Sequence, residues 1–454
     1  MQVDSELVPF APPAQPLVGL PGLLAFRRNY IETFPRSAYE QGTTRISTGL
    51  TDMLLLCDPA LIQEMLVDRA DMFIRDRASQ RALAPVLGEN SLLLAEGADW
   101  RWQRRAAAPI FRHETLLSFV PAIADIAGQQ VARWRHAGDA PVEANGAMIR
   151  TTLDIIVATM LGGAANLDVE AYGRALGQVL EGAQWLAMYA MLSLPRWTPY
   201  PGWWRTRRAR NYLRREMARI LAARRARPSS ARPDLLDLLK AARDAETGRH
   251  MTDAELLTNL LTFINAGHET TAVALTWTLW LLARDEAVQE ELVHEVRAVA
   301  GDAAIEAAHI ERLVLCRQVI QEAMRLYPPV PALARQPRVA LALGEHRIAP
   351  TTNVVVPIFA LHRHERLWEN PLTFAPGRFA TDAAKGRARY AYLPFGAGPR
   401  VCIGASFAML EATVILATLV RAFRLRPVVG HKPKPVARVS LRLYGGMPLH
   451  VAPR

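Results

Sequence analysis

The ten residues Phe395-Gly396-Ala397-Gly398-Pro399-Arg400-Val401-Cys402-Ile403-Gly404 join a glycine-rich loop, one cysteine and the start of an apolar helical run. We call this stretch the cysteine loop. Its three glycines allow the backbone to pass close to a bulky group. A cysteine at the N-terminal end of a helix lies where backbone N–H groups and the helix dipole favour the thiolate. Such a thiolate is a nucleophile or a metal ligand. A lone cysteine is more often a small buried hydrophobe, but the surrounding pattern favours the reactive role here.

The composition is that of a large folded protein. The chain has 454 residues, of which 50% are hydrophobic, and no linker divides it. We therefore expect a single catalytic domain over residues 1–454 without a fused reductase domain. The cysteines Cys57, Cys316 and Cys402 form no C-x-x-C pair. This spacing excludes a disulfide framework and a Cys-rich zinc or iron–sulfur site, and it fits a reducing, cytoplasmic location.

The charge balance is strongly basic. The net charge is +11, and only four of the 54 basic residues are Lys. Because such a bias often reflects genome composition, we expect no nucleic-acid binding, and a basic patch for an acidic protein partner instead. No apolar stretch approaches the roughly 20 residues that span a bilayer. The start of the chain carries Asp4 and Glu6 and lacks the basic region of a signal peptide. We expect a soluble protein with no transmembrane segment.

The first hundred residues hold short strands and an irregular stretch. Residues 44–57 contain two short runs that are typical of a hairpin. Residues 73–97 contain Pro85, Gly88 and Gly97, which predicts a flexible lid over a pocket.

An aromatic stretch follows in the first half of the chain. Residues 185–204 are rich in Trp, Tyr and Met, and arginines follow them. One interpretation is a substrate-access region that makes weak contact with a membrane surface. The other is a helix–turn–helix packed on the core, which we favour at roughly two to one.

A long helix is predicted in the middle of the chain. Thr252-x-x-Glu255 has the form of a capping box, and apolar residues continue to about Ala283. One stretch, Ala266-Gly267-His268-Glu269-Thr270-Thr271, interrupts the pattern. Glycine and two β-branched threonines weaken a helix. A charged Glu269 between apolar flanks is out of place, and local rules tend to break at functional sites. We therefore predict a functional kink rather than an ordinary kink with solvent-facing polar residues.

Four motifs, in this order, resemble the cytochrome P-450 superfamily of haem-thiolate monooxygenases. Trp100-x-x-x-Arg104 matches W-x-x-x-R, residues 266–271 match A/G-G-x-D/E-T, and Glu322-x-x-Arg325 matches E-x-x-R. The cysteine loop matches F-x-x-G-x-R-x-C-x-G at every fixed position. E-x-x-R alone carries no information, since helix-surface pairs of this kind are common and weak. The chain departs from the family where P-E-R-F is usual, because Pro376-Gly377-Arg378-Phe379 keeps the arginine and loses the acid.

The resemblance implies a mainly α fold with small β-sheets, in which one large domain has a helical lobe and a smaller β-rich lobe. It implies haem b (iron protoporphyrin IX), with the Cys402 thiolate as axial ligand of the iron, which favours O–O cleavage. Arg105 rivals Arg104 as a propionate partner, since both lie on one turn. The residues that match the family's haem-binding positions are Trp100, Arg104, Arg335, Phe395, Arg400 and Gly404. Glu322, Arg325 and Arg378 would form a triad that pins the chain beneath the haem.

On the opposite side of the haem, the resemblance gives Thr270 and Glu269 catalytic roles. Thr270 would hydrogen-bond dioxygen or the water that serves it, and Glu269 would deliver protons by rotating toward solvent. Ala266 and Gly267 would leave room for dioxygen at the kink. Apolar residues would line the substrate pocket, which implies a hydrophobic small molecule such as a fatty acid, a terpenoid or an aromatic compound; they include Phe263, Ala266, Val330 and Leu333.

The resemblance also implies redox partners, because the chain carries no flavin or iron–sulfur module. Electrons would come from NAD(P)H through a ferredoxin reductase and a ferredoxin that docks near Cys402. We expect a monomer of the soluble bacterial type. The alternatives are a peroxide-using haem-thiolate enzyme or isomerase, and a non-enzymatic haem-based ligand binder. The pair of Glu269 and Thr270 favours the monooxygenase, since members that dispense with dioxygen tend to lack such a pair.

Overall fold

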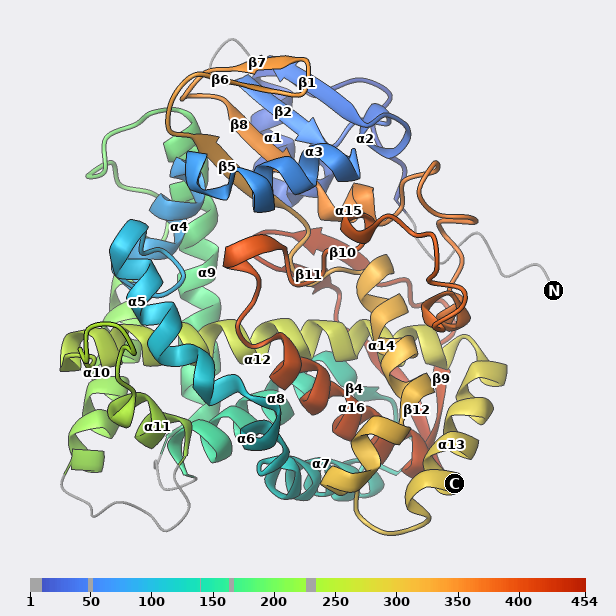
Figure 1. Cartoon of the computed structure of the whole chain (residues 1–454). Helices are drawn as coiled ribbons and strands as arrows, with labels where there is room; N and C mark the ends of the chain where they lie inside the picture. The colour runs from blue at the N-terminus through green and yellow to red at the C-terminus, as the bar shows by residue number, and fades with distance from the viewer. Residues whose placement is uncertain (1–9, 48–51, 139, 163–166, 226–233) are drawn as a thin grey trace.

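The computed structural model describes residues 10–47, 52–138, 140–162, 167–225 and 234–454. Their fold is mainly helical with small sheets, as the sequence predicts (Figure 1). The helices are α1 Gly19–Asn29, α2 Ser37–Glu40, α3 Pro59–Gln63, α4 Arg77–Leu87, α5 Gly97–Ala107, α6 His113–Leu117, α7 Val120–Arg135, α8 Ala144–Leu161, α9 Val169–Met191, α10 Trp203–Arg225, α11 Leu235–Ala241, α12 Asp253–Ala283, α13 Glu286–Ala300, α14 Val314–Leu326, α15 Ile358–Leu361 and α16 Ala405–Ala422.

The strands form small sheets that lie mostly to one end of the molecule and along its C-terminal segment (Figure 1). One sheet has the order β1-β2-β8-β5-β3, and the others pair β10 with β11, β6 with β7, and β4 with β12 and β9. The bounds are β1 Thr43–Ser47, β2 Asp52–Leu56, β3 Phe73–Arg75, β4 Val142–Glu143, β5 Leu333–Pro337, β6 Leu341–Leu343, β7 His346–Ile348, β8 Asn353–Val356, β9 Phe423–Pro427, β10 Lys434–Ala437, β11 Leu441–Tyr444 and β12 Pro448–Pro453. The antiparallel pairing of β1 with β2 confirms the predicted hairpin strands; residues 48–51 between them lie outside the described part.

Helix α12 crosses the middle of the molecule and is buried along most of its length (Figure 1). A helix that is apolar on nearly all sides must be covered on all sides, and α12 packs against α8, α10, α14 and α16. Its N-terminus has the predicted capping box, because Thr252 and Glu255 bond to each other's backbone N–H groups.

Residues 266–271, where the sequence predicts a functional kink, lie within one continuous helix, so the interrupted apolar pattern does not break α12. The hydroxyls of Thr270 and Thr271 donate to the carbonyls of Ala266 and Gly267, at 2.7 and 2.9 Å. This bonding satisfies the hydroxyls without breaking the helix. Gly267 lies against α8, where a Cβ would come within 2.8 Å of Ile156 Cδ1. The glycine therefore allows two helices to approach closely.

The predicted irregular stretch at residues 73–97 is also largely ordered, since it contains strand β3 and helix α4. Asp76 is the residue in the sequence that marks the start of α4. Its carboxylate accepts the backbone N–H of Ser79 at 2.8 Å and caps the helix. Gly88 ends the helix with a φ of +88°. Pro85 lies inside α4 without ending it.

Residues 185–204 form the favoured helix–turn–helix, with α9 ending at Met191 and α10 starting at Trp203. The turn is not wholly packed, however. Trp197 is 82% exposed and Trp204 is 65% exposed.

Helix α16 follows the cysteine loop and packs against α7, α13 and α14. Its 18 residues are long and apolar enough to cross a membrane by length and composition alone, which corrects the expectation that no apolar stretch approaches this length. Most of the helix is buried inside the fold, as in a core helix.

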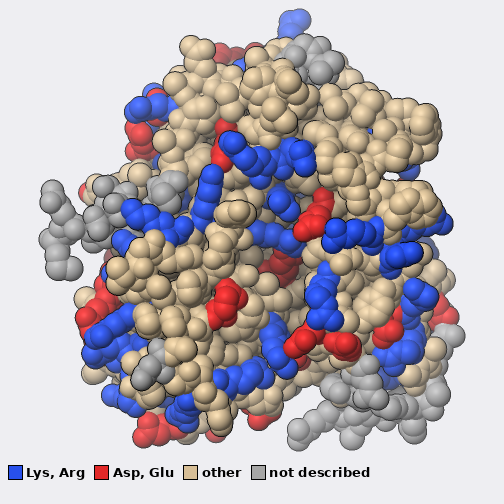
Figure 2. Space-filling model, turned by 180° about the vertical axis from the view of Figure 1, so that it is seen from behind, with Lys and Arg blue, Asp and Glu red and all other residues tan. Residues whose placement is uncertain are grey.

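The surface carries the basic excess of the sequence. Figure 2 shows Lys and Arg side chains gathered around the middle of the face opposite to that of Figure 1, with acidic side chains among them. This face of the molecule therefore carries positive charge.

Candidate active site

The cysteine loop folds back on itself just before α16. The backbone N–H of Cys402 donates to the carbonyl of Phe395 at 2.9 Å, and Gly398–Arg400 form a 3₁₀ turn. Gly404 is the N-cap residue of α16. Cys402 therefore lies two residues before the N-cap of a long buried helix, close to the helix start that the sequence predicts.

The glycines of this loop have different roles. Gly398 has a φ of +69°, and a Cβ there would lie 1.8 Å from the carbonyl oxygen of Leu66. At this glycine the backbone approaches another backbone segment. Gly396 has a φ of +73° and lies beside Leu333 of β5, whereas a Cβ at Gly404 would have no neighbour within 4 Å.

The Cys402 side chain has exposed surface, yet it lies among protein atoms. Burial raises the pKa of Cys402, and a backbone N–H at Gly404 and the charge of Arg104 only partly oppose this. The backbone N–H groups near the helix start therefore favour the thiolate, as the sequence predicts, but burial outweighs them. We call the surroundings of this exposed but desolvated side chain the Cys402 recess. A bound cation would supply the missing stabilisation of the thiolate.

A strip of α12 is also left uncovered. Ala266 is exposed and Thr270 is half-buried, although the residues that follow them toward Ala283 are buried. These two residues are four apart, so they share one face of the helix. Val330 and Leu333 are half-buried, and Phe263 is 9% exposed. This side of α12 is therefore not covered by side chains of the described residues.

Several guanidinium groups meet near the cysteine loop. Arg335 of β5 lies opposite Arg75 of β3 in the sheet register. Burial, followed by the charges of Arg75 and Arg400, lowers the pKa of Arg335 to about 9. Arg400 donates to Glu96 at 2.8 Å and lies 4.4 Å from the ring centroid of Trp100.

This arginine cluster has unused donors. Arg400 Nη1 and Arg75 Nε are buried and have no hydrogen-bond partner among the described residues. Buried cations with free donors fit an anion, and carboxylates are their usual partners. The cluster, the recess at Cys402 and the uncovered strip of α12 together fit haem, whose propionates are carboxylates.

Arg75 and Glu96 were missed by the sequence analysis, which places both in an irregular lid. The signal was the short strand at residues 73–75, which pairs Arg75 with Arg335.

Arg104 makes no hydrogen bond or ion pair with the described residues, and its charge acts on Cys402. Its rival Arg105 is engaged elsewhere, because it donates to both carboxylate oxygens of Asp244 at 2.8 and 3.0 Å.

The structure brings the expected triad together. Arg325 donates to both carboxylate oxygens of Glu322 at 2.7 and 2.8 Å, and Arg378 donates to one of them at 3.1 Å. Glu322 also accepts the backbone N–H of Ala375 at 2.9 Å. A Cβ at Gly377 would have no neighbour within 4 Å. The segment therefore folds onto the triad without the acid that is common at this position.

Glu269 and Thr270 are adjacent but have different partners. The Thr270 hydroxyl donates within α12, whereas the Glu269 carboxylate accepts hydrogen bonds from Ser440 and Arg442. Burial alone would raise the pKa of Glu269, but the charge and hydrogen bond of Arg442 and the hydrogen bond of Ser440 outweigh it. The pKa therefore lies below its ordinary value.

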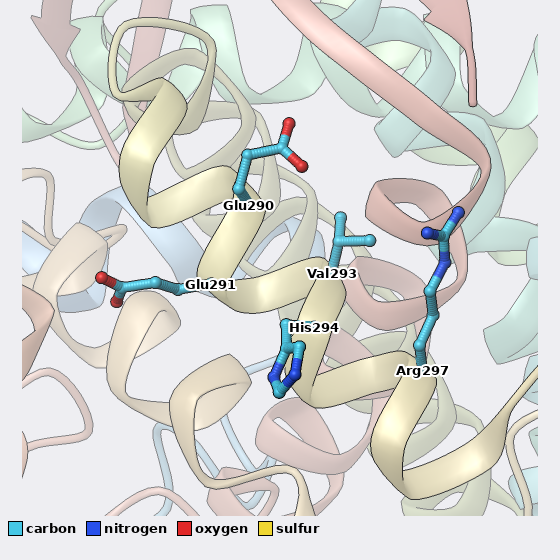
Figure 3. Close-up of a pocket in the computed structure, with 5 residues that line it drawn as sticks. All are labelled: Glu290, Glu291, Val293, His294 and Arg297. Atoms are coloured by element: carbon cyan, nitrogen blue, oxygen red, sulfur yellow. The ribbon is translucent and has the colours of Figure 1, made fainter.

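Two surface hollows lie away from Cys402. One, of about 560 Å³, follows α13, from which Glu290, Glu291, Val293, His294 and Arg297 project (Figure 3). It contains no predicted site residue. The other, of about 470 Å³, lies between α4, α9 and α10 and includes Leu94, Glu96 and Leu186. Glu96 connects this second hollow to the arginine cluster.

Comparisons with known proteins agree with this geometry. The family model described as "Cytochrome P450" matches residues 11–443. The chain is 31% identical to cyclooctatin synthase of Streptomyces melanosporofaciens, over 95% of this chain and 93% of that protein. It is 28% identical to cytochrome P450 4A11 of Homo sapiens, over 93% and 83% of the two chains. The crystal structure of the cytochrome P450DA heme domain shares the fold, with a TM-score of 0.81 at 24% identity over 91% and 90% of the two chains.

Proposed function

The chain belongs to the cytochrome P450 family of monooxygenases, and from this premise we propose that it hydroxylates a hydrophobic small molecule as a soluble protein of the bacterial type. The reaction is RH + O2 + 2 e⁻ + 2 H⁺ → ROH + H2O. The observation that carries the proposal is the convergence of three features: the Cys402 recess, the uncovered strip of α12 at Ala266 and Thr270, and the unpaired donors of Arg75 and Arg400.

The residues of the chain would hold haem b from two directions. Cys402 would ligate the iron, with Phe395 and Gly404 beside it in the cysteine loop. Arg335, Arg400, Arg104 and Trp100 would hold the propionates, and we add Arg75 to this set because its buried Nε has no hydrogen-bond partner among the described residues. When bound, haem supplies dioxygen activation and oxygen transfer.

The remaining site residues place protons and substrate. Thr270 presents its hydroxyl on the uncovered strip, and Glu269 next to it holds a carboxylate that can carry a proton. Phe263, Ala266, Val330 and Leu333 supply apolar surface, which supports a fatty acid, a terpenoid or an aromatic compound as substrate. Relatives carry names as different as cyclooctatin synthase and cytokinin hydroxylase, so the substrate is proposed only as a hydrophobic molecule.

We further propose one catalytic domain over residues 1–454, in a cytoplasmic monomer. NAD(P)H would supply electrons through a ferredoxin reductase and a ferredoxin, and the net charge of +11 supports an acidic partner. The exposed Trp197 and Trp204 mark where a weak membrane contact would form. Failure to bind anionic liposomes at low salt would exclude that contact.

The reduced, carbon-monoxide-bound protein tests the haem assignment. We expect the red-shifted Soret band of thiolate-ligated haem in the wild type and its loss in Cys402→Ser. Persistence of the band in the variant would refute the ligand.

A second experiment tests the reaction. A panel of fatty acids, terpenes and aromatic compounds is screened for spin-state shifts, and a positive compound is then incubated with dioxygen and a ferredoxin system. We expect a hydroxylated product. Equal turnover with peroxide alone would favour the peroxide-using alternative. Ligand binding without turnover in either system would favour the non-enzymatic alternative.

A further inference from the structure

A carboxylate in the central helix is held by a distant hairpin. Glu269 is 9% exposed, and its Oε1 accepts hydrogen bonds from Ser440 Oγ and Arg442 Nε, both at 2.7 Å. Ser440 precedes β11 and Arg442 lies within it, in the C-terminal hairpin of β10 and β11. The side chain beside Thr270 is therefore fixed by residues more than 170 positions away in the chain.

The hairpin is itself well anchored. The backbone N–H of Leu441 donates to the carbonyl of Pro329 at 2.8 Å, next to Val330 of the proposed pocket. The buried Asn29 side chain donates to the Pro435 carbonyl at 3.0 Å and accepts the Ala437 N–H at 2.7 Å. Side chains on anchored elements hold their partners in a defined position.

The electrostatics of the contact keep the carboxylate ionised. Burial opposes the charge of Glu269, and Arg442 and Ser440 offset this burial. His268, on the same helix, is the other titratable group of the described residues that acts on this carboxylate. Burial lowers the pKa of His268, so its ring is neutral at pH 7 and Arg442 is the principal counter-charge. The Arg442 side chain keeps 28% exposure, so it has a route to water.

We propose that Arg442, supported by Ser440, is a positioning residue that holds the Glu269 carboxylate as an anion beside Thr270 and thereby sets the pH range in which Glu269 passes protons to the site. The inference deepens the proposed function and rests on it. Arg442 acts through Glu269, to which it donates its Nε–H.

The test is an infrared pH titration of the purified holoenzyme. The carboxyl band of Glu269 is identified by its absence in Glu269→Gln. In Arg442→Gln, the buried carboxylate loses its counter-charge. We therefore expect the midpoint pH of the Glu269 titration to rise by about one pH unit or more. Ser440→Ala should move it less in the same direction, and Arg442→Lys should restore much of the wild-type value. Arg438→Gln is the matched control, because Arg438 lies in the turn of the same hairpin and its side chain makes no hydrogen bond or ion pair with the described residues.

A second readout separates positioning from folding. Peroxide released per reductant consumed is measured against pH with a compound that shifts the spin state. We expect the pH profile to move with the infrared titration in Arg442→Gln and to return toward wild type in Arg442→Lys.

The outcomes are distinct. An unchanged infrared titration in both Arg442→Gln and Ser440→Ala would overturn the inference, as would a shifted titration with an unshifted peroxide profile. If Arg442→Gln does not fold, Arg442→Lys and Ser440→Ala decide the same question. The carbon-monoxide spectrum is independent of these residues. Its failure in the wild type would refute the proposed function even where the Glu269 titration moves as expected.

Discussion

At the scale of single residues, the structure separates side chains that hold the fold from those that face the recess. Gly398 is required by a backbone contact with Leu66, whereas a Cβ at Gly404 would meet no atom of the protein. Cys402 has exposed surface, whereas the other cysteines, Cys57 and Cys316, are buried. Neighbouring residues of one motif therefore serve different purposes.

Gly398→Ala should destabilise the protein strongly, because the new Cβ would overlap the Leu66 carbonyl and the φ of +69° is unfavourable for alanine. We expect a loss above roughly 2 kcal/mol, measured as a lower melting temperature and lower haem content. Gly377→Ala is the control, since a Cβ there has no neighbour within 4 Å among the described residues, and its melting temperature should stay near wild type. Equal melting temperatures in the two variants would contradict this assignment.

Glu322→Gln should also lower the stability of the folded protein, because it leaves the fully buried Arg325 without its counter-charge. Breaking a buried pair costs about 3–5 kcal/mol, so we expect a marked fall in melting temperature and haem content. Asp382→Asn is the matched control: it pairs with Lys385 at the same spacing of three residues, but on the surface, where a pair contributes about 1 kcal/mol or less. Similar losses in both variants would be inconsistent with a role for burial.

At the scale of elements, helix α16 contains an unusual buried acid. Glu411 is fully buried, and neither carboxyl oxygen has a hydrogen-bond partner within normal geometry among the described residues. Burial raises the pKa of Glu411 well above its ordinary value, and Thr271 of α12 only partly opposes this. The helix therefore holds a neutral carboxyl group at its contact with α12.

Glu411→Gln should change the pH dependence of stability. An acid with a raised pKa in the folded state stabilises the fold below its unfolded pKa, and this contribution is lost as the pH rises through the folded pKa. The melting temperature of the variant relative to wild type should therefore be more favourable at pH 8 than at pH 5. Glu291→Gln, on the exposed face of α13, is the control and should show no such trend. The same relative melting temperature for Glu411→Gln at both pH values would disprove the neutral state.

At the scale of the whole molecule, the basic excess is the property that a partner meets first. The net charge is +11, and the face in Figure 2 carries many Lys and Arg side chains. Long-range attraction of an acidic partner depends on this sum and is screened over about 10 Å at 0.1 M salt.

Reduction of the protein by an acidic ferredoxin should slow as the salt concentration rises. We expect a fall of about tenfold or more in the second-order rate between low and high salt, followed by stopped-flow absorbance. Reduction by an uncharged deazaflavin is the control and should change little. A ferredoxin rate that is independent of salt would rule out electrostatic steering.

The sequence by itself determined the family, the mainly helical fold and the capping box of α12. The reason is local: the cysteine loop, the E-x-x-R pair and the cap are short motifs whose residues stand next to one another in the chain. Periodicity also placed the long apolar helix, because burial on nearly all sides requires apolar residues on nearly all sides.

Only the tertiary structure decided which distant groups meet. The pairing of Glu269 with Arg442, of Arg75 with Arg335 and of Arg105 with Asp244 joins segments far apart in the chain. The interrupted apolar pattern at residues 266–271 leaves the helix continuous for a related reason. Helix propensity is a small local preference, and threonine hydroxyls bonded to their own helix, together with packing on α8 and α16, outweigh it.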